Sequence, residues 1–150
     1  MHALKLLKTD HANVQSLFGQ FERISASFEK KDEMFALIRR ELQLHSRAEE
    51  EIFYPMLKAL SGVGPDLASE AIKQHKEVDQ LLTQISRLKP NDRSYDEKVE
   101  ILIENVERHI EEEEGEIFRF AEENCSVEQL EDLGRQIEDR KRILDQQMAA

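Results

Sequence analysis

Apolar residues recur along most of the chain at alternating steps of three and four positions, the spacing of amphipathic helices that pack in a bundle. This pattern predicts helices over residues 3–29, 32–60, 65–88, 95–124 and 127–148. Thr9 or Asp10 is suited to cap a helix, so we expect the first segment to begin with a short helix that leads into a main one near His11.

Three short segments interrupt the helical pattern. The charged run 30–33 is expected to connect the first two helices. Residues 61–65 contain two glycines and a proline and are the clearest break, with Pro65 placed to open the next helix. The last of these loops is expected over residues 89–94.

Four long helices joined by short loops predict an all-α fold, an antiparallel up-down four-helix bundle with an additional C-terminal helix. We expect a single domain over residues 1–150, with the bundle at about 3–124 and the last helix at about 127–148. Ser126 and Gln129 form a capping box at the start of that last helix. Its apolar face is interpreted as packing against the bundle or contributing to a homodimer.

The apolar stripes contain a few polar residues, and these have a common pattern. His45 and Glu49 lie one turn apart on the second helix, and His109 and Glu113 repeat that spacing on the fourth. A glutamate on a buried stripe is costly unless its charge is compensated. A histidine one turn away suggests a metal cation as the compensation.

The first and third helices each contribute one histidine, so the two hairpins look like copies of one unit. Equal distances from the hairpin loops bring the polar residues of the stripes to one level of the bundle, within about one turn of each other. The candidate metal ligands are His11, His45, Glu49, His75, His109 and Glu113. A single histidine on an apolar face is usually an ordinary core residue, but here every histidine except His2 lies on a stripe.

Imidazole and carboxylate ligands suit iron, manganese, zinc or copper. Six ligands are too many for one tetrahedral zinc, and they divide naturally over two metals, with two histidines each and both carboxylates available to bridge. Such a pair leaves open positions for a small ligand such as O2, peroxide or nitric oxide.

Several neighbouring residues are alternatives at the site. Gly115 favours a local bulge that would turn Glu114 inward in place of Glu113. Asp79 lies one turn after His75 and is interpreted as solvated rather than as a ligand. Tyr54 is expected to pack, with a hydrogen bond near the site or ligation as the alternatives.

The composition narrows the classes of partner. A formal net charge of -11 argues against nucleic acid and against an anionic membrane surface. The polar N-terminal segment does not read as a signal peptide. The single cysteine, Cys125, allows no internal disulfide and is interpreted as a partly buried structural residue, so a reducing cytoplasm is the simplest location.

The order H…HxxxE…H…HxxxE over residues 4–124 resembles the hemerythrin-like family of cation-binding bundles. The resemblance implies a non-haem di-iron centre, bridged by oxide or hydroxide and held by the six residues above, with manganese or zinc less favoured. It also has a departure: the oxygen-carrying hemerythrins have a fifth histidine where this chain has Asp79, and they place the last carboxylate at the position of Glu114. Oxygen carriage is therefore disfavoured.

The function expected is that of a di-iron protein that binds or senses O2, iron or a reactive small molecule. The alternative is a di-iron enzyme that turns over hydrogen peroxide, as a catalase does, or nitric oxide. A weaker alternative is a structural metal that stabilises the bundle. The sequence does not decide whether the protein is an enzyme.

Overall fold

The structure is a computed structural model that describes residues 2–24 and 27–149. The α-helices are α1 (Ala3–Arg23), α2 (Phe28–Ala48), α3 (Tyr54–Ala59), α4 (Gly64–Ser86), α5 (Arg93–Glu112), α6 (Phe118–Asn124) and α7 (Val127–Ala149). Two π-helical turns, η1 (Glu49–Phe53) and η2 (Glu113–Ile117), join α2 to α3 and α5 to α6 without a break. The described part of the chain contains no β-strand, which confirms the all-α class.

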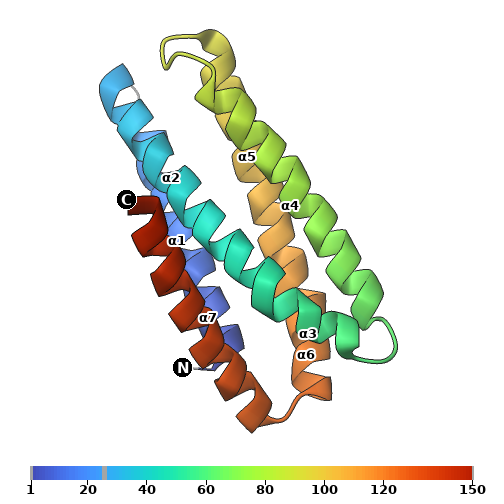
Figure 1. Ribbon diagram of the computed structural model, residues 1–150. Helices are drawn as coiled ribbons and strands as arrows, with labels where there is room; N and C mark the ends of the chain where they lie inside the picture. Colours follow the sequence, from blue (N-terminus) through green and yellow to red (C-terminus); the bar gives the residue numbers. More distant parts are fainter. Residues whose placement is uncertain (1, 25–26, 150) are drawn as a thin grey trace.

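Two helical hairpins make up the bundle. In the first, α1 packs against the long rod α2–η1–α3, and in the second, α4 packs against the rod α5–η2–α6. Figure 1 shows the four long elements side by side, and α7 returning along the outside of the first hairpin. This is the predicted bundle with an additional C-terminal helix.

The last helix packs against α1 and α2 of its own chain, which decides between the two interpretations of its apolar face. The Ser126–Gln129 capping box is present in both directions, with N–O distances of 2.7 and 3.1 Å. Leu130, Ile137 and Leu144 are buried on the inner face. Because the bundle covers this face, the helix no longer argues for a homodimer.

The start of the chain differs from the prediction. Helix α1 is unbroken from Ala3 to Arg23, so neither Thr9 nor Asp10 caps a helix. The cap is His2, whose Nδ1 accepts a hydrogen bond from the backbone N–H of Leu4 at 3.1 Å. An imidazole nitrogen replaces the hydroxyl or carboxylate that usually does this, and the prediction of a short separate helix was wrong.

The first loop also lies earlier than expected. Helix α2 begins at Phe28 because the hydroxyl of Ser27 accepts from the backbone N–H of Lys30, so residues 30–33 are helical and not a connector. Phe28 is 53% exposed and does not extend the stripe of α1. Lys31 is buried and pairs with the carboxylate of Asp96 at 3.0 Å. Ser25, which belongs to the helix predicted over residues 3–29, lies outside the described residues.

The predicted break at residues 61–65 is present. Gly62 has a φ of 85°, a conformation that L side chains rarely adopt. Pro65 lies in the first turn of α4. At Gly64 an added Cβ would lie 2.2 Å from the carbonyl oxygen of Leu57, so only glycine allows this close approach.

The π-helical turns shift the buried face of both long rods by one residue. A π turn contains an extra residue, so the α-helical period is interrupted there. From the end of η1 onward the buried side chains are Phe53, Tyr54 and Leu57. Ile52 and Met56, where steps of three and four from Glu49 would continue the stripe, are half-buried. The bulge expected near Gly115 is η2, but nothing in the sequence analysis predicted η1.

The apolar core consists of two clusters that lie along the bundle on either side of a polar layer. One includes Leu4, Leu7, Phe53, Leu57, Phe118 and Ile137, and the other includes Val14, Phe18, Ile38, Leu42, Leu82 and Leu102. The histidines lie between them in sequence, as His11 does between Leu7 and Val14. The candidate ligands are therefore enclosed by core at both ends.

Replacing Ile137 with alanine tests the packing of α7. Ile137 is fully buried, so we expect the variant to lose about 2–4 kcal/mol of unfolding free energy in a urea titration. The control is Ile143→Ala on the same helix, where the side chain is 41% exposed and the expected loss is below about 0.5 kcal/mol. Equal losses in the two variants would contradict the assigned inner face.

Candidate metal centre

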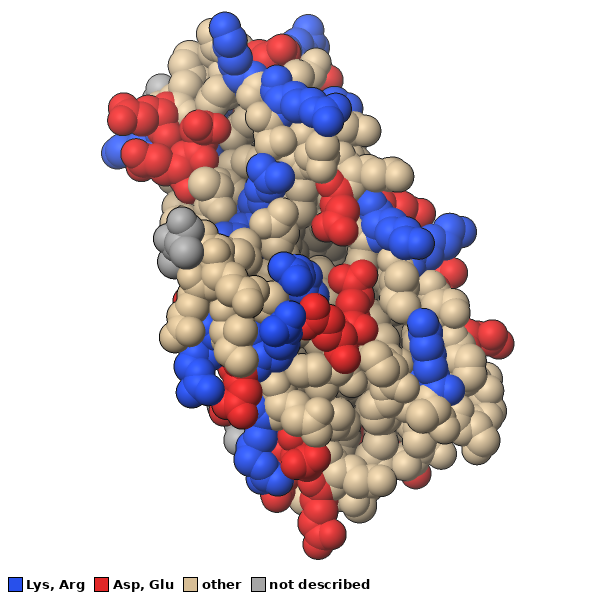
Figure 2. All heavy atoms as spheres, in the orientation of Figure 1, with Lys and Arg blue, Asp and Glu red and all other residues tan. Residues whose placement is uncertain are grey.

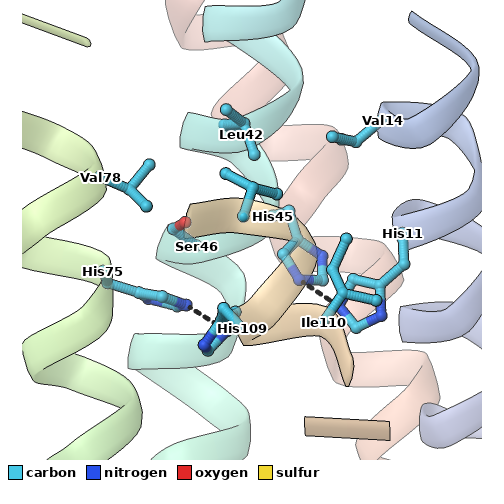
Figure 3. Close-up of a pocket in the computed structure, with 10 residues that line it drawn as sticks. His11, Val14, Leu42, His45, Ser46, His75, Val78, His109 and Ile110 are labelled. Carbon is cyan, nitrogen blue, oxygen red and sulfur yellow. Dashed lines mark hydrogen bonds between the residues drawn. The ribbon is translucent and has the colours of Figure 1, made fainter. Parts of the chain in front are cut away.

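Four histidine rings project toward one another from four helices (Figure 3). They are His11 of α1, His45 of α2, His75 of α4 and His109 of α5, and all four are buried. Glu49 and Glu113 are the first residues of the two π turns, and both are 0% exposed. The structure thus brings together all six residues that the sequence analysis selected.

The six side chains form two overlapping groups. One contains His11, His45, Glu49 and Glu113, and the other contains Glu49, His75, His109 and Glu113. Within each group the candidate ligand atoms all lie within 4.8 Å of one another. Both carboxylates belong to both groups, an arrangement in which each can bridge two metal ions.

The spacing of the ligand atoms fits a metal at the centre of each group. The Nε2 atoms of His11 and His45 are 3.1 Å apart, and those of His75 and His109 are 3.3 Å apart. Two ligands that are each about 2.1 Å from a metal lie about 3.0 Å apart at a right angle and about 3.4 Å apart at the tetrahedral angle. Two imidazoles that face each other in this way suit a shared cation.

Buried atoms without a hydrogen-bond partner also indicate a cation. Among the described residues, Oε2 of Glu49 and Oε1 of Glu113 are buried and have no hydrogen bond. The Glu113 oxygen is 3.1 Å from Nε2 of His11, but without hydrogen-bond geometry. A buried carboxylate oxygen left in this state is costly, and a metal ion would satisfy it.

The outward-facing nitrogens of the first hairpin's histidines have acceptors. Nδ1 of His45 donates to the carboxylate of Asp10 at 3.0 Å, and Nδ1 of His11 donates to Glu114 at 2.7 Å. Lys141 of α7 pairs with the other oxygen of Asp10. Such acceptors fix the ring orientation and leave Nε2 available as a metal ligand.

The second hairpin repeats this arrangement at positions 64 residues later. Gln74 takes the place of Asp10 and accepts from Nδ1 of His109. Glu50 takes the place of Glu114, but its oxygen is 3.5 Å from Nδ1 of His75 and makes no hydrogen bond. The two halves of the site are therefore related by an approximate twofold symmetry.

Tyr54 breaks this symmetry. Its hydroxyl donates to Oε2 of Glu113 at 2.6 Å and lies 3.1 Å from both Oε1 of Glu49 and Nε2 of His75. The residue 64 positions later is Phe118, which stacks on His11 with ring centroids 6.0 Å apart. One half of the centre thus has a phenol oxygen beside it, and the other half has a hydrocarbon ring.

The sequence and the fold both match known cation-binding proteins. Residues 2–121 match the model of the hemerythrin HHE cation-binding domain. The chain belongs to the hemerythrin HHE cation-binding family. A solved HHE domain-containing protein from Mycobacterium kansasii has the same fold, with a TM-score of 0.83 over 95% of this chain and 86% of that one, at 24% identity.

Two curated relatives are longer than this HHE domain. The chain is 28% identical over 148 residues to a DNA nickase of Nostoc sp., covering 99% of this chain and 41% of the nickase. It is 29% identical over 105 residues to an uncharacterized hemerythrin-like protein of Schizosaccharomyces pombe, covering 69% of this chain and 52% of that protein. The HHE domain thus spans about half or less of these relatives.

The neighbouring residues that were alternatives at the HHE site lie at different places relative to it. Asp79 is exposed and belongs to neither ligand group. Glu114 does not replace Glu113, because it lies outside η2's buried face and contacts the far nitrogen of His11. Tyr54 lies within the centre and is not only a packing residue. Cys125 is partly buried, and burial raises the pKa of its thiol.

Sequence reasoning missed the outer acceptors Asp10 and Gln74, and it also missed Glu50, which lies beside His75 without a hydrogen bond to it. A signal was present: Asp10 and Gln74 each directly precede the single histidine of their hairpin, and Glu50 and Glu114 each directly follow the stripe glutamate. These positions point off the apolar stripe, so the helical period assigned them to the solvated face.

Buried charges shift the pKa values of the centre in opposite directions. Burial lowers the pKa of His75, but its contacts with Glu49 and Glu50 outweigh burial and raise it to about 9. Glu49 and Asp10 raise the pKa of His45 well above its usual value, again against burial. Burial favours the neutral form of Glu113, but its hydrogen bonds hold its pKa well below the usual range.

These shifts predict that metal binding depends on pH. His75 is protonated below about pH 9 and must lose its proton to ligate, so the apparent affinity rises as the pH rises toward 9. The expected slope is roughly tenfold per pH unit for each proton released. Competition between the metal-free protein and a metal-binding dye measures it, and an affinity that does not change between pH 6.5 and 9 would contradict the assignment.

Proposed function

We propose that this HHE domain holds a non-haem di-iron centre. His11 and His45 would hold one iron, His75 and His109 would hold the other, and Glu49 and Glu113 would contribute to both sites, because they belong to both ligand groups. The observation that supports this proposal most strongly is the pair of ligand groups that share both carboxylates. Nitrogen and oxygen donors without thiolate suit iron as well as manganese and zinc, and membership of the hemerythrin HHE family favours iron among them.

The charge of the proposed centre leaves room for further ligands. Two divalent cations carry twice the charge of the two bridging glutamates, so we expect a bridging oxide or hydroxide and solvent to supply the rest. Beside the four histidines lies a cavity with about 20 Å³ of room for a water-sized molecule. One water needs about 10–15 Å³, so the cavity admits only a small ligand.

The function that follows is binding or sensing of O2, iron or a reactive small molecule. The centre lacks a fifth imidazole, because the residue one turn after His75 is Asp79 and its carboxylate is exposed. Having fewer imidazole ligands favours the ferric state, so reversible carriage of O2 is disfavoured. The HHE domain is proposed to bind or sense its ligand at the iron pair and not to carry O2.

Turnover of hydrogen peroxide is the second candidate, and Tyr54 favours it. Peroxide disproportionation converts two H2O2 into two H2O and one O2, and protons must be delivered to the departing oxygen. Burial, together with Glu113 and Glu49, raises the pKa of Tyr54 well above its usual value, so the phenol keeps its proton at neutral pH. It is therefore available as a hydrogen-bond donor beside the centre, where it can stabilise the negative charge that develops on the departing oxygen. When bound, the iron pair supplies the redox chemistry.

Two further predictions concern the partners and the location of the protein. On the face in Figure 2 acidic and basic side chains are interspersed, and the net charge is -11, so we still expect no nucleic-acid partner. The activity of the nickase is a property of that longer relative. In the described part of the chain, no helix is both long and apolar enough to cross a membrane. The cytoplasm remains our proposed location.

Single substitutions distinguish two bridged sites from one. We expect about two irons per chain in the wild type, about one in His11→Ala or His109→Ala, and none in Glu49→Ala, because Glu49 belongs to both groups. Elemental analysis of anaerobically loaded protein measures this. The control is His2→Ala, which lies outside both groups and should retain both irons. A Glu49→Ala variant that keeps one tightly bound iron would refute the proposal that Glu49 contributes to both iron sites.

Oxygen evolution on addition of peroxide separates the two candidate functions. If the domain is an enzyme, the iron-loaded protein evolves O2, and Tyr54→Phe slows this by about 10²-fold or more with the iron content unchanged. The control is Tyr95→Phe, a second buried tyrosine that lies in the apolar cluster away from the ligands. No oxygen from the wild type would exclude peroxide turnover and favour binding or sensing over this enzymatic function.

A further inference from the structure

The small cavity beside the histidines is closed on two opposite sides by unlike residues. Its wall is otherwise made of the four histidines and the apolar side chains Val14, Leu42, Val78 and Val106. Figure 3 shows Ser46 on the side of α4 and Ile110 on the side of α1. These two residues are 64 positions apart and are thus equivalent in the approximate twofold symmetry.

Ser46 also lines an outer groove between α2 and α4, which we call the α2/α4 groove. The groove has about 320 Å³ of room, and its wall includes Gln43, Arg47 and Glu50 on one side and Asp79 and Thr83 on the other. Among the residues that the structure describes, Ser46 alone lines both this groove and the inner cavity. Its small side chain is therefore what separates the groove from the histidines at this point.

The equivalent groove between α1 and α5, which we call the α1/α5 groove, is closed more firmly. It has about 640 Å³ of room, and within the described part of the chain it shares only Ile110 with the inner cavity. Isoleucine has a bulkier, branched side chain than serine and buries it here. The α1/α5 groove is thus the larger of the two grooves, but a bulkier side chain lies between it and the inner cavity.

The two glutamates beside the outer grooves also differ in how firmly they are held. Beside the α1/α5 groove, Glu114 holds Nδ1 of His11 at 2.7 Å. Beside the α2/α4 groove, Glu50 is 3.5 Å from Nδ1 of His75, and that nitrogen has no hydrogen-bond partner among the described residues. Glu50 is therefore held less firmly at its groove than Glu114 is at the other.

We propose that small ligands reach the metal centre through the α2/α4 groove and pass Ser46, whose size limits what can enter. The ligands admitted are uncharged molecules of the size of O2, nitric oxide or hydrogen peroxide, because the cavity behind Ser46 is narrow and its wall beyond the histidines is apolar. This proposal rests on the di-iron centre proposed above.

The test is the rate at which nitric oxide binds the iron-loaded, reduced protein, followed by stopped-flow absorption without oxygen. Ser46→Ile copies the barrier of the opposite side, and we expect it to slow binding about tenfold or more while the final absorbance change and iron content stay at wild-type values. Adding Ile110→Ser to that variant opens the other side and should restore much of the rate. The matched control is Ser16→Ile, the same change at an exposed serine of α1, with an unchanged rate.

Each outcome decides one proposal. A wild-type rate in Ser46→Ile with full iron content would overturn the access route and leave the di-iron centre intact. A wild-type protein that takes up no iron would instead overturn the proposed function. Should Ser46→Ile fail to fold or to load iron, Ser46→Val adds a smaller barrier and should slow binding in the same direction. An unchanged rate in that variant would also refute the route.

Discussion

The burial of two carboxylates at the centre of the bundle is the constraint on which the rest of this structure depends. Glu49 and Glu113 have no exposed surface, and an isolated carboxylate in such a place would be strongly destabilising. Four imidazoles surround them, and outer acceptors hold three of those rings by hydrogen bonds at Nδ1. Apolar clusters then enclose the layer at both ends, which keeps water from screening its charges.

Each of the two π-helical turns lies directly at this polar layer. Both begin at a bridging glutamate, and both rotate the following residues by the extra position that a π turn contains. In the first rod this rotation points Tyr54 into the site, where a regular α-helix would place it away from the buried stripe. The backbone irregularity is thus located where it supplies a polar group to the metal layer.

The fold and the six inner residues follow from the sequence because each of the six lies on the apolar stripe of its own helical segment. Apolar neighbours such as Leu42 and Val106 mark the stripe, and a histidine or glutamate within it is conspicuous. What lies off the stripe was not predictable in the same way. Asp10 and Gln74 reach the site only across a helix interface, and η1 lacks the glycine that made η2 visible. The start of α2 depended on the Ser27 cap, which a periodic pattern does not detect.

The repeated hairpin makes the two halves of the site equivalent, so their differences carry the specific information. Tyr54 opposite Phe118 sets one half apart chemically, and Ser46 opposite Ile110 sets one side apart sterically. Both the phenol and the open side lie on the half of the centre that contains His75. The measurement that tests the central claim most directly is titration of the metal-free protein with ferrous iron, followed by Mössbauer spectroscopy after oxidation. Saturation at about two irons per chain with the spectrum of a coupled diferric pair is the predicted result. Saturation at one iron, or two irons that are magnetically independent, would contradict a carboxylate-bridged pair.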